Sequence, residues 1–201
     1  LSHGQVVSVL AETVPEWLYV DMGTMAAGGV TNGIYPTDSA KQVEYILNDS
    51  RTRFLFVENE EQLDKALEVR ENCPDLEKIF IFDMEGLADF KDPMVMSFDE
   101  LLELGRDCDR ANPALWEKLV NSSKAEELAL LVYTSGTTGP PKGAMLSHRN
   151  VIFQLSNADA FIPIEPNGEQ LAFLPLCHVP DRTFPAFLPP PARQNAGRER
   201  G

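Results

Sequence analysis

The sequence is poor in basic residues: 17 lysines and arginines stand against 31 aspartates and glutamates, which gives a net charge of -14 at pH 7. A surface that binds nucleic acid needs clustered positive charge to displace the counterions of the phosphate backbone. The charge balance therefore argues against nucleic acid as a partner. It also means that a site for an anionic nucleotide has to build its positive field locally, from backbone amides and a few cations.

Cysteine, histidine and long apolar runs are also scarce. The three cysteines and three histidines are scattered without metal-ligand spacing, which predicts a reduced, metal-free interior and a cytoplasmic location. No uninterrupted apolar stretch approaches the roughly 18 residues that a membrane-spanning helix needs. The first residues show no basic and then apolar signal. We therefore expect no transmembrane segment in these residues.

What the sequence does contain is an alternation of apolar strands and amphipathic helices. Strands are expected at residues 5–10, 53–58, 78–83, 128–134 and 170–176, and helices within 15–27, 37–50, 59–72, 97–107 and 147–161. Near-continuous apolar strands are typical of a parallel sheet that helices cover on both faces. We predict an α/β fold with a mostly parallel sheet, whose strand order the pattern does not determine.

Capping signals and aromatic positions refine this prediction. Ser97 and Glu100 have the spacing of a capping box, and Ser147 is placed to cap the helix that follows it. Trp17 and Trp116 occupy helical positions and are predicted to be core residues.

The last thirteen residues, "PPPARQNAGRERG", differ from the rest in composition, because proline, arginine and glycine replace the apolar periodicity. We expect residues 1–188 to be part of one domain. Residues 189–201 are either a flexible tail or the product of a reading frame lost near Phe187 or Leu188. The chain opens on Leu1 rather than methionine, directly before an apolar segment, so we also expect it to be a fragment of a longer protein.

A glycine-rich segment, "YTSGTTGPPKGAMLSH", follows the strand at residues 128–134. Its glycines allow backbone angles that turn several amides towards one anion, and its hydroxyl groups and lysine add donors and a mobile charge. Ligands bind α/β sheets at the carboxyl ends of strands. The segment is therefore predicted to bind phosphate. The candidate residues are Thr134, Ser135, Gly136, Thr137, Thr138, Gly139, Lys142 and Gly143.

The spacing within this segment excludes two common nucleotide motifs. The pattern G-x-x-x-x-G-K-[ST] requires a hydroxyl after the lysine, where this sequence has Gly143, and a dinucleotide G-x-G-x-x-G is absent. A surface turn rich in glycine and threonine remains the alternative. The full pattern S-G-T-T-G-x-P-K-G after a buried strand favours phosphate binding over that alternative.

The segment "YTSGTTGPPKGAMLSHRN" resembles the phosphate-loop signature of AMP-forming acyl-CoA synthetases, which belong to the adenylate-forming superfamily. "LAFLPLCHVPDRTF" is similar to the family's next motif, which lines the acyl or pantetheine channel. Residues 14–50 are similar to its early helix, proline turn and second helix. "CHVPDRTF" together with "ENCPDLEKIFIFD" favours the long-chain fatty-acid branch. The resemblance runs from about residue 5 to 187, within the family's large N-terminal domain.

The resemblance implies a two-step reaction. A fatty carboxylate attacks the α-phosphorus of ATP and pyrophosphate leaves; the thiol of coenzyme A then displaces AMP from the acyl-adenylate. The implied phosphate ligands are the eight candidates given above, with the Thr134 hydroxyl near Mg²⁺ and Lys142 as a phosphate clamp, not a catalytic residue. His178 is implied to line the channel, although a histidine beside an apolar strand is also often a hydrogen-bonded core residue.

Several motifs of the family are not found in this sequence. There is no G-Y-G-x-T-E stretch for adenine, no T-G-D for ribose, and no C-terminal domain with its catalytic lysine. We therefore expect that the chain alone holds no catalytic residue and does not turn over, while the protein to which it belongs uses ATP, fatty acid and coenzyme A. Peripheral association of that protein with a membrane is left open.

Three other functions are compatible with parts of the sequence. The first is an adenylating enzyme of another branch, such as an aryl-CoA ligase or a peptide-synthetase adenylation domain, because the acyl pocket lies mostly downstream. The second is a non-catalytic nucleotide-binding or pseudogene product. The third, a conventional P-loop phosphotransferase, fits poorly because Lys142 is not followed by Ser or Thr.

Overall fold

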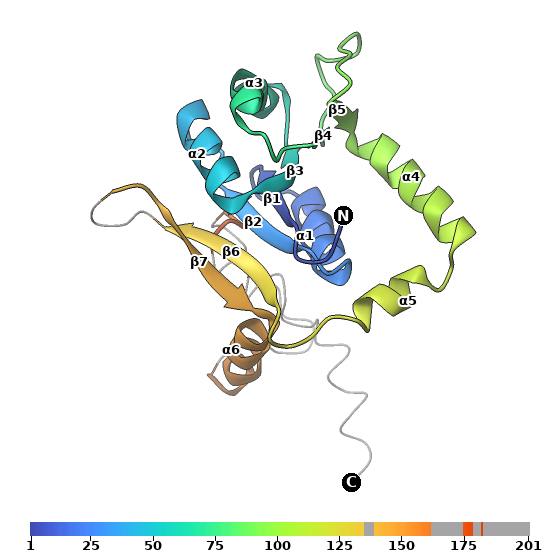
Figure 1. Cartoon of the computed structure of the whole chain (residues 1–201), viewed down its shortest axis with the longest axis vertical. Coiled ribbons are helices and arrows are strands. Elements are labelled where there is room, and N and C mark those ends of the chain that lie inside the picture. Colours follow the sequence, from blue (N-terminus) through green and yellow to red (C-terminus); the bar gives the residue numbers. More distant parts are fainter. Residues whose placement is uncertain (135–138, 162–174, 179–181, 183–201) are drawn as a thin grey trace.

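The computed structural model describes residues 1–134, 139–161, 175–178 and 182 (Figure 1). Within these residues, seven strands form one sheet in the order β5-β4-β3-β1-β2-β6-β7. The strands are β1 (Val6–Leu10), β2 (Val30–Ile34), β3 (Thr52–Val57), β4 (Lys78–Ile81), β5 (Val95–Ser97), β6 (Leu128–Thr134) and β7 (Lys142–Ser147). All neighbouring pairs are parallel except the β6–β7 hairpin, which is antiparallel. The predicted α/β fold with a mostly parallel sheet is confirmed.

Helices cover both faces of the sheet, as predicted (Figure 1). They are α1 (Pro15–Ala26), α2 (Ala40–Ser50), α3 (Glu60–Val69), η1 (Arg70–Asn72), α4 (Phe98–Ala111), α5 (Leu115–Val120) and α6 (His148–Phe161). On one face, α2 and α3 bury Val43, Leu47 and Leu63 against the strands. On the other, Trp17 of α1 and Phe98 of α4 join the aromatic residues of β3 and β4 in a second core. The central strands are therefore apolar on both sides, which explains their continuous hydrophobic pattern.

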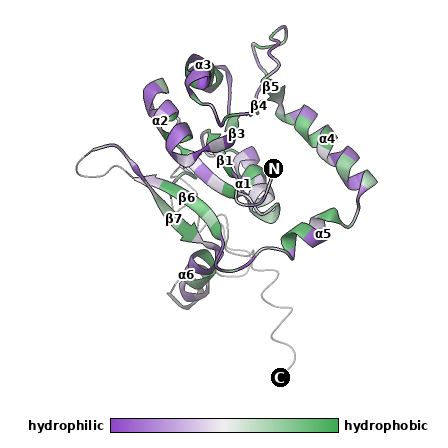
Figure 2. Ribbon diagram, viewed as in Figure 1, coloured by the Kyte–Doolittle hydropathy of each residue, from purple (hydrophilic) through white to green (hydrophobic). Residues whose placement is uncertain are grey.

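The helices are amphipathic and begin at polar caps. In Figure 2, α2, α3 and α4 alternate between hydrophilic and hydrophobic residues, as expected for helices with one face on a sheet. The predicted capping box of α4 is present: the Glu100 amide donates to the Ser97 hydroxyl (3.2 Å), and the Ser97 amide donates to the Glu100 carboxylate (2.9 Å). Ser39 forms the same arrangement with Gln42 at the start of α2. The Ser147 hydroxyl accepts from the Asn150 amide at the start of α6 (3.3 Å).

Strand β2 was not predicted, because its sequence "VTNGI" carries polar residues and a glycine where a buried strand normally has apolar ones. Thr31 and Asn32 are nevertheless buried, and the side-chain NH2 group of Asn32 is hydrogen-bonded, whereas its side-chain oxygen and the Thr31 hydroxyl have no partner among the described residues. The Asn32 amide donates to the Ser8 hydroxyl (3.0 Å), which shares a 2.6 Å hydrogen bond with the Thr52 hydroxyl. A hydrogen-bonded network across three strands thus replaces apolar contacts here.

Strand β7 is the second difference from the prediction. The residues after Pro141 were expected to continue the loop into the helix, whereas the structure places Lys142–Ser147 in a strand that pairs with β6. Thr134 lies opposite Lys142, and Tyr133 lies opposite Gly143. Lys142 and Gly143 are therefore held by a ladder of hydrogen bonds and not by a free loop.

Three further differences concern smaller elements. Strand β5 and helix α5 were not predicted, since both are short. Trp116 was predicted to be a core residue, but it is 57% exposed, whereas Trp17 is fully buried. The reason is that α5 contacts the end of α1 and lies beyond the sheet. Most of the strand expected at 170–176, and the whole tail expected from residue 189, lie outside the described residues.

Candidate functional site

A cavity of about 340 Å³ opens where β2 and β6 end side by side. Both strands are parallel, so their carboxyl ends meet at one edge of the sheet, which is the usual ligand-binding edge of an α/β fold. The two strands and the segment after β2 provide most of the wall, and α2, Pro141 and His178 complete it. The lining residues are Gly33, Tyr35, Asp38, Gln42, Ile46, Val132, Tyr133, Thr134, Pro141 and His178.

The predicted phosphate-binding residues are only partly placed by the structure. Thr134 is the last residue of β6; it is exposed and lines the cavity. Gly139 has a φ of 94°, in the region that favours glycine. Lys142 is the cross-strand neighbour of Thr134, and directly opposed residues of an antiparallel pair project to the same face. Residues 135–138 lie outside the described residues, so their phosphate contacts stay a prediction.

Gly143 has a packing role that the motif alone does not suggest. A Cβ at this position would lie 3.1 Å from the ring of Tyr133 on the facing strand, so the glycine makes room for that ring. The Tyr133 hydroxyl donates to the Asp49 carboxylate at 2.6 Å. Burial, followed by this hydrogen bond, raises the pKa of Tyr133 above its ordinary value. The start of the hairpin is thus tied to α2.

A second hydrogen bond ties the other flank of the glycine-rich segment to the same helix. The Tyr45 hydroxyl donates to the backbone carbonyl of Pro141 at 3.0 Å. Tyr45 and Asp49 are one turn apart on α2 and therefore share a face. These two residues were missed from the sequence. Their spacing of four within a helix was visible, but the partners they reach are nearly a hundred residues away.

His178 lies at the same cavity as Thr134. Its side chain is exposed, and its ring meets the ring of Tyr35 edge-on, with centroids 5.7 Å apart and planes at 82°. The structure thus brings two separate motifs to one cavity, together with Tyr35, which the sequence reading did not select. A channel-lining role for His178 stays a prediction.

Gly33 explains how the segment carrying His178 comes so close to the sheet. A Cβ on Gly33 would lie 2.7 Å from both Cα and Cβ of Cys177 and 3.2 Å from the ring of Trp17. A glycine inside a strand often marks such a close approach, and this was the available signal in the sequence. Burial raises the pKa of Cys177 to about 12, so its sulfur is a protonated packing group.

The charge of the cavity wall is negative rather than positive. Asp38 lines the cavity, and burial raises the pKa of its carboxyl, opposed by a backbone hydrogen bond of Tyr35 and by the charge of Lys65. Neither a lysine nor an arginine lines the cavity within the part of the chain that the structure describes. A phosphate here would therefore depend on backbone amides and on Lys142, as the overall charge suggested.

The lining residues fit a magnesium ion whose coordination shell comes mainly from phosphate oxygens of the nucleotide and from water. The described residues contain no group of three or more His, Cys, Asp or Glu side chains suited to a metal. Mg²⁺ in nucleotide sites takes few protein ligands and completes its shell with phosphate oxygens and water. The exposed Thr134 hydroxyl at the cavity could supply such a single oxygen, whereas a cage made by the protein alone is not available in the described part.

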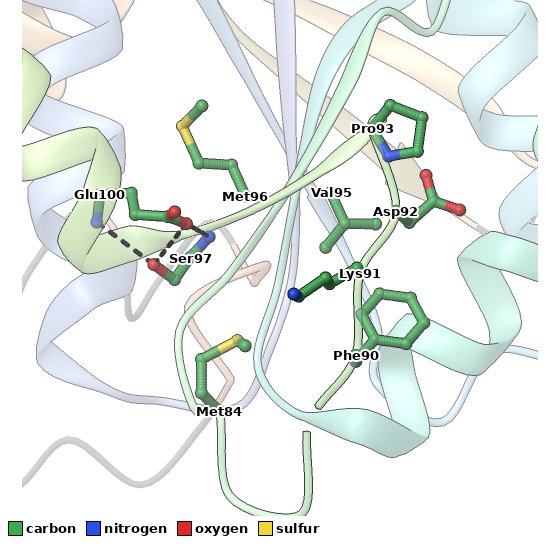
Figure 3. Close-up of a pocket in the computed structure, with 9 residues that line it drawn as sticks. All are labelled: Met84, Phe90, Lys91, Asp92, Pro93, Val95, Met96, Ser97 and Glu100. Carbon is green, nitrogen blue, oxygen red and sulfur yellow. Dashed lines mark hydrogen bonds between the residues drawn. The ribbon is translucent and has the colours of Figure 1, made fainter. Parts of the chain in front are cut away.

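Another cavity, of about 380 Å³, lies at the opposite end of the sheet, between the chain before β5 and the start of α4 (Figure 3). Lys91 extends into it, but its other charged groups are already engaged. Glu100 belongs to the capping box of α4, where hydrogen bonds from Ser97 lower its pKa. Asp92 accepts from Arg70 at 2.5 Å. We place the functional site at the β2–β6 edge because Thr134 and His178, from two sequence motifs, both line the cavity there.

None of the helices in the described part of the chain combines the length and the apolar character that crossing a bilayer requires.

Comparison with protein families identifies the class of protein to which this chain belongs. The family model for AMP-binding enzymes matches residues 1–189, which is nearly the whole sequence. The chain therefore belongs to the AMP-binding enzyme family, and the resemblance found in the sequence is confirmed.

Curated relatives show which members of this family the chain is similar to. The chain is 34% identical over 183 residues to the long-chain-fatty-acid–CoA ligase ACSBG1 of Bos taurus, covering 89% of this chain and 24% of that protein. It is 33% identical over 188 residues to the long-chain-fatty-acid–CoA ligase ACSBG2 of Homo sapiens, covering 93% and 27%. The chain thus spans about a quarter of the length of the curated relatives it matches.

Solved structures agree on the fold. ATP-bound MatB of Rhodopseudomonas palustris superposes with a TM-score of 0.67 at 19% identity, covering 94% of this chain and 33% of that one. The anthranilate CoA ligase AuaEII in complex with anthranoyl-AMP gives a TM-score of 0.59 at 24% identity, covering 78% and 27%. At these identities the likeness shows the fold of adenylate-forming enzymes.

Proposed function

We propose that this chain is part of an ATP-dependent long-chain-fatty-acid–CoA ligase, in which it binds the phosphates of ATP and forms one wall of the acyl channel. One observation carries the proposal: Thr134 and His178, from two motifs far apart in the sequence, line the same cavity at the carboxyl ends of β2 and β6. The names of the curated relatives support the choice of substrate.

In the proposed first half-reaction, the fatty carboxylate forms a bond to the α-phosphorus of ATP while the bond to pyrophosphate breaks. The negative charge that develops on the leaving diphosphate has to be stabilised where it forms. We assign this task to the Thr134 hydroxyl, the amides and hydroxyls of residues 135–139, and Lys142. Magnesium, when bound, would supply further charge neutralisation, with Thr134 as its protein oxygen. In the second half-reaction the coenzyme A thiol attacks the acyl carbonyl, and AMP leaves.

We assign His178, which lines the cavity, to the channel through which the acyl and pantetheine groups would pass. Its exposed ring, held against the edge of Tyr35, could move without disturbing the core. The α2 contacts through Tyr45 and Tyr133 hold the two flanks of the glycine-rich segment. We infer that these contacts keep the phosphate donors in place during both half-reactions.

The first test uses the chain alone. Given ATP, Mg²⁺, palmitate and coenzyme A, it is expected to release no pyrophosphate above background, because the adenine and ribose motifs and the catalytic lysine of the family are absent from this sequence. Sustained turnover would contradict this expectation.

The second test concerns the substrate and uses a longer protein, in which the chain is completed by the family's remaining segments. Acid-dependent exchange of pyrophosphate into ATP is expected with palmitate, and not with benzoate or amino acids. Exchange with an aryl or amino acid alone would assign the protein to another adenylating branch. Exchange with no acid, and no heat on titration of the chain with ATP, would favour the non-catalytic alternative.

The proposal includes a reducing compartment. All three cysteines are free: Cys73 and Cys177 are buried, and Cys108 is exposed. Free thiols on stable folds are typical of the cytoplasm. Cell fractionation of the longer protein, with a high-salt wash of the membrane fraction, would separate a cytoplasmic pool from a peripherally bound one.

A further inference from the structure

A fully buried ion pair joins α1 to the segment that carries His178. The Arg182 Nε donates to Asp21 Oδ2 at 2.9 Å, and its Nη2 donates to Asp21 Oδ1. The side chains of Arg182 and Asp21 are 1% and 0% exposed. The guanidinium also lies over the ring of Trp17, 4.9 Å from its centroid. Two parallel hydrogen bonds and a stacked ring fix the arginine in one orientation.

Arg182 is connected to His178 by the backbone. Its amide donates to the carbonyl of His178 (3.1 Å), and the His178 amide donates to the carbonyl of Pro175 (2.8 Å). Within the first of these turns, from Pro175 to His178, Leu176 and Cys177 are buried, with Cys177 against Gly33 of β2. The position of the His178 imidazole at the cavity is therefore coupled to the position of the Arg182 guanidinium, which is bound to Asp21 of α1.

The charges make this coupling strong. A buried carboxylate or guanidinium that loses its partner is left unpaired in a medium of low dielectric constant, which is far less favourable than its paired state. If the segment moves away from the sheet, Arg182 must either leave Asp21 unpaired inside the protein or remain behind and hold the segment. An apolar contact of the same size tolerates small shifts of the segment, whereas the paired hydrogen bonds between guanidinium and carboxylate form in one geometry only.

We propose that Asp21 and Arg182 are positioning residues: together they latch residues 175–178, through Arg182, onto α1 and β2 and so hold His178 at the cavity. What His178 does there rests on the proposed function, but the latch itself is a property of this chain. Its test therefore needs no activity.

The cysteines provide a matched pair of reporters. Cys177 lies under the latch, and Cys73 lies in the core on the other face of the sheet; each is 4% exposed. Burial raises the pKa of Cys177 to about 12 and that of Cys73 to about 11. Neither thiol should react with 5,5′-dithiobis(2-nitrobenzoate) unless the protein opens around it. The exposed Cys108 is removed by Cys108→Ser.

In this background, Arg182→Met is expected to accelerate the labelling of Cys177 at least about tenfold, because hydrogen bonds between charged groups are worth more than one power of ten in an equilibrium constant. The labelling of Cys73 is expected to stay unchanged. Peptide mass spectrometry assigns each rate. The matched control is Arg149→Met, which breaks an exposed Arg–Glu pair with Glu126 and should change neither rate.

Two further variants keep the test decisive if the single change prevents folding. Asp21→Asn combined with Arg182→Met removes both charges, so no unpaired ion remains, while the latch is still lost. Arg182→Lys keeps the charge and loses the paired geometry, and should give an intermediate rate for Cys177. Selective acceleration of Cys177 in the double variant supports the latch.

Equal acceleration of Cys73 and Cys177 would mean that the ion pair supports the whole fold, and this would overturn the proposal. Unchanged labelling of Cys177 would mean that apolar contacts such as those of Leu176 hold the segment, which also overturns it. Failure of the ligase proposal would appear in the pyrophosphate assays alone and would leave these labelling rates as they are.

Discussion

The two walls of the cavity are held in different ways. On the α2 side, the flanks of the glycine-rich segment depend on tyrosine hydroxyls at partly buried positions, which donate to Asp49 and to the carbonyl of Pro141. On the α1 side, the segment with His178 depends on a fully buried ion pair and a stacked tryptophan. Each hydrogen bond on the α2 side involves at most one charged group and lies at a partly buried position, so it opens at smaller cost than a fully buried ion pair. The α2-side wall is therefore the more adjustable of the two, and the wall with His178 is anchored.

The largest effect is expected from breaking the anchored wall. Asp21→Ala should lower the free energy of unfolding by about 3 kcal/mol or more, because it leaves the Arg182 guanidinium buried without its carboxylate. Urea unfolding followed by circular dichroism measures this change. Arg149→Met is the surface control and should leave the midpoint unchanged. A loss as small as that of the control would show that the anchored wall is no stronger than the other.

A smaller effect is expected where the anchored wall touches the sheet. Gly33→Ala should cost about 1–3 kcal/mol, because its Cβ would overlap Cys177 in a closely packed region. Gly105→Ala in α4 is the matched control: nothing lies within 4 Å of its Cβ position, and alanine is the better helix former. The control should raise the thermal midpoint while Gly33→Ala lowers it. Equal midpoints would mean that the 175–178 segment can shift outward freely.

Much of the sheet could be predicted from the sequence, and the reason is visible in particular strands. The strands β1, β3, β4 and β6 are short apolar runs buried on both faces, which is a local property. In β2, by contrast, the side-chain NH2 group of Asn32 donates to Ser8, a residue of another strand, and no local pattern encodes that pairing. The hairpin strand β7 was hidden for a related reason, since its register depends on what it faces in β6.

The candidate site divides in the same way. Thr134 and His178 were found because each belongs to a motif that is contiguous in the sequence. Tyr45, Asp49 and the Asp21–Arg182 pair were missed because each acts on a partner far along the chain. Motifs pointed to groups that line the cavity, whereas the groups that hold them in place become visible only when the fold brings them together.

The adjustable wall should respond more mildly. Tyr133→Phe and Tyr45→Phe each remove one hydrogen bond: the loss should be about 1 kcal/mol for Tyr45, whose partner is a neutral carbonyl, and about 1.5–2 kcal/mol for Tyr133, whose partner is a carboxylate. Their distinguishing effect is local: hydrogen exchange at the amides of β7 should speed up, while exchange in β1 and β3 stays the same. Tyr19→Phe, at an exposed tyrosine of α1, is the control and should affect neither region. Uniform acceleration over the whole sheet would refute a local tie.

The smallest effect concerns pH. The pKa of Tyr133 is raised, chiefly by burial, so the folded state keeps its phenolic proton longer than the unfolded state does. The contribution of Tyr133 to the free energy of unfolding is therefore present below about pH 10 and is lost as the pH rises further, because the unfolded state then loses the proton first. At pH 10.5 the loss should be less than about 1 kcal/mol. Unfolding titrations at several alkaline pH values measure this slope, which Tyr133→Phe should flatten. An unchanged slope in that variant would assign the loss to other groups, such as Tyr35, whose pKa is also raised.

The pairing of Thr134 with Lys142 fixes the register of β7 on β6, and so fixes which residues on either side of the glycine-rich segment face the same way. Closing a slightly longer connection is entropically inexpensive, but a shift of the ladder by one residue turns every side chain of β7 to the opposite face. A hydroxyl and an ammonium group that now share one face would then be separated by the thickness of the strand. The length of the connection can therefore vary more freely than the register of the two residues at its ends.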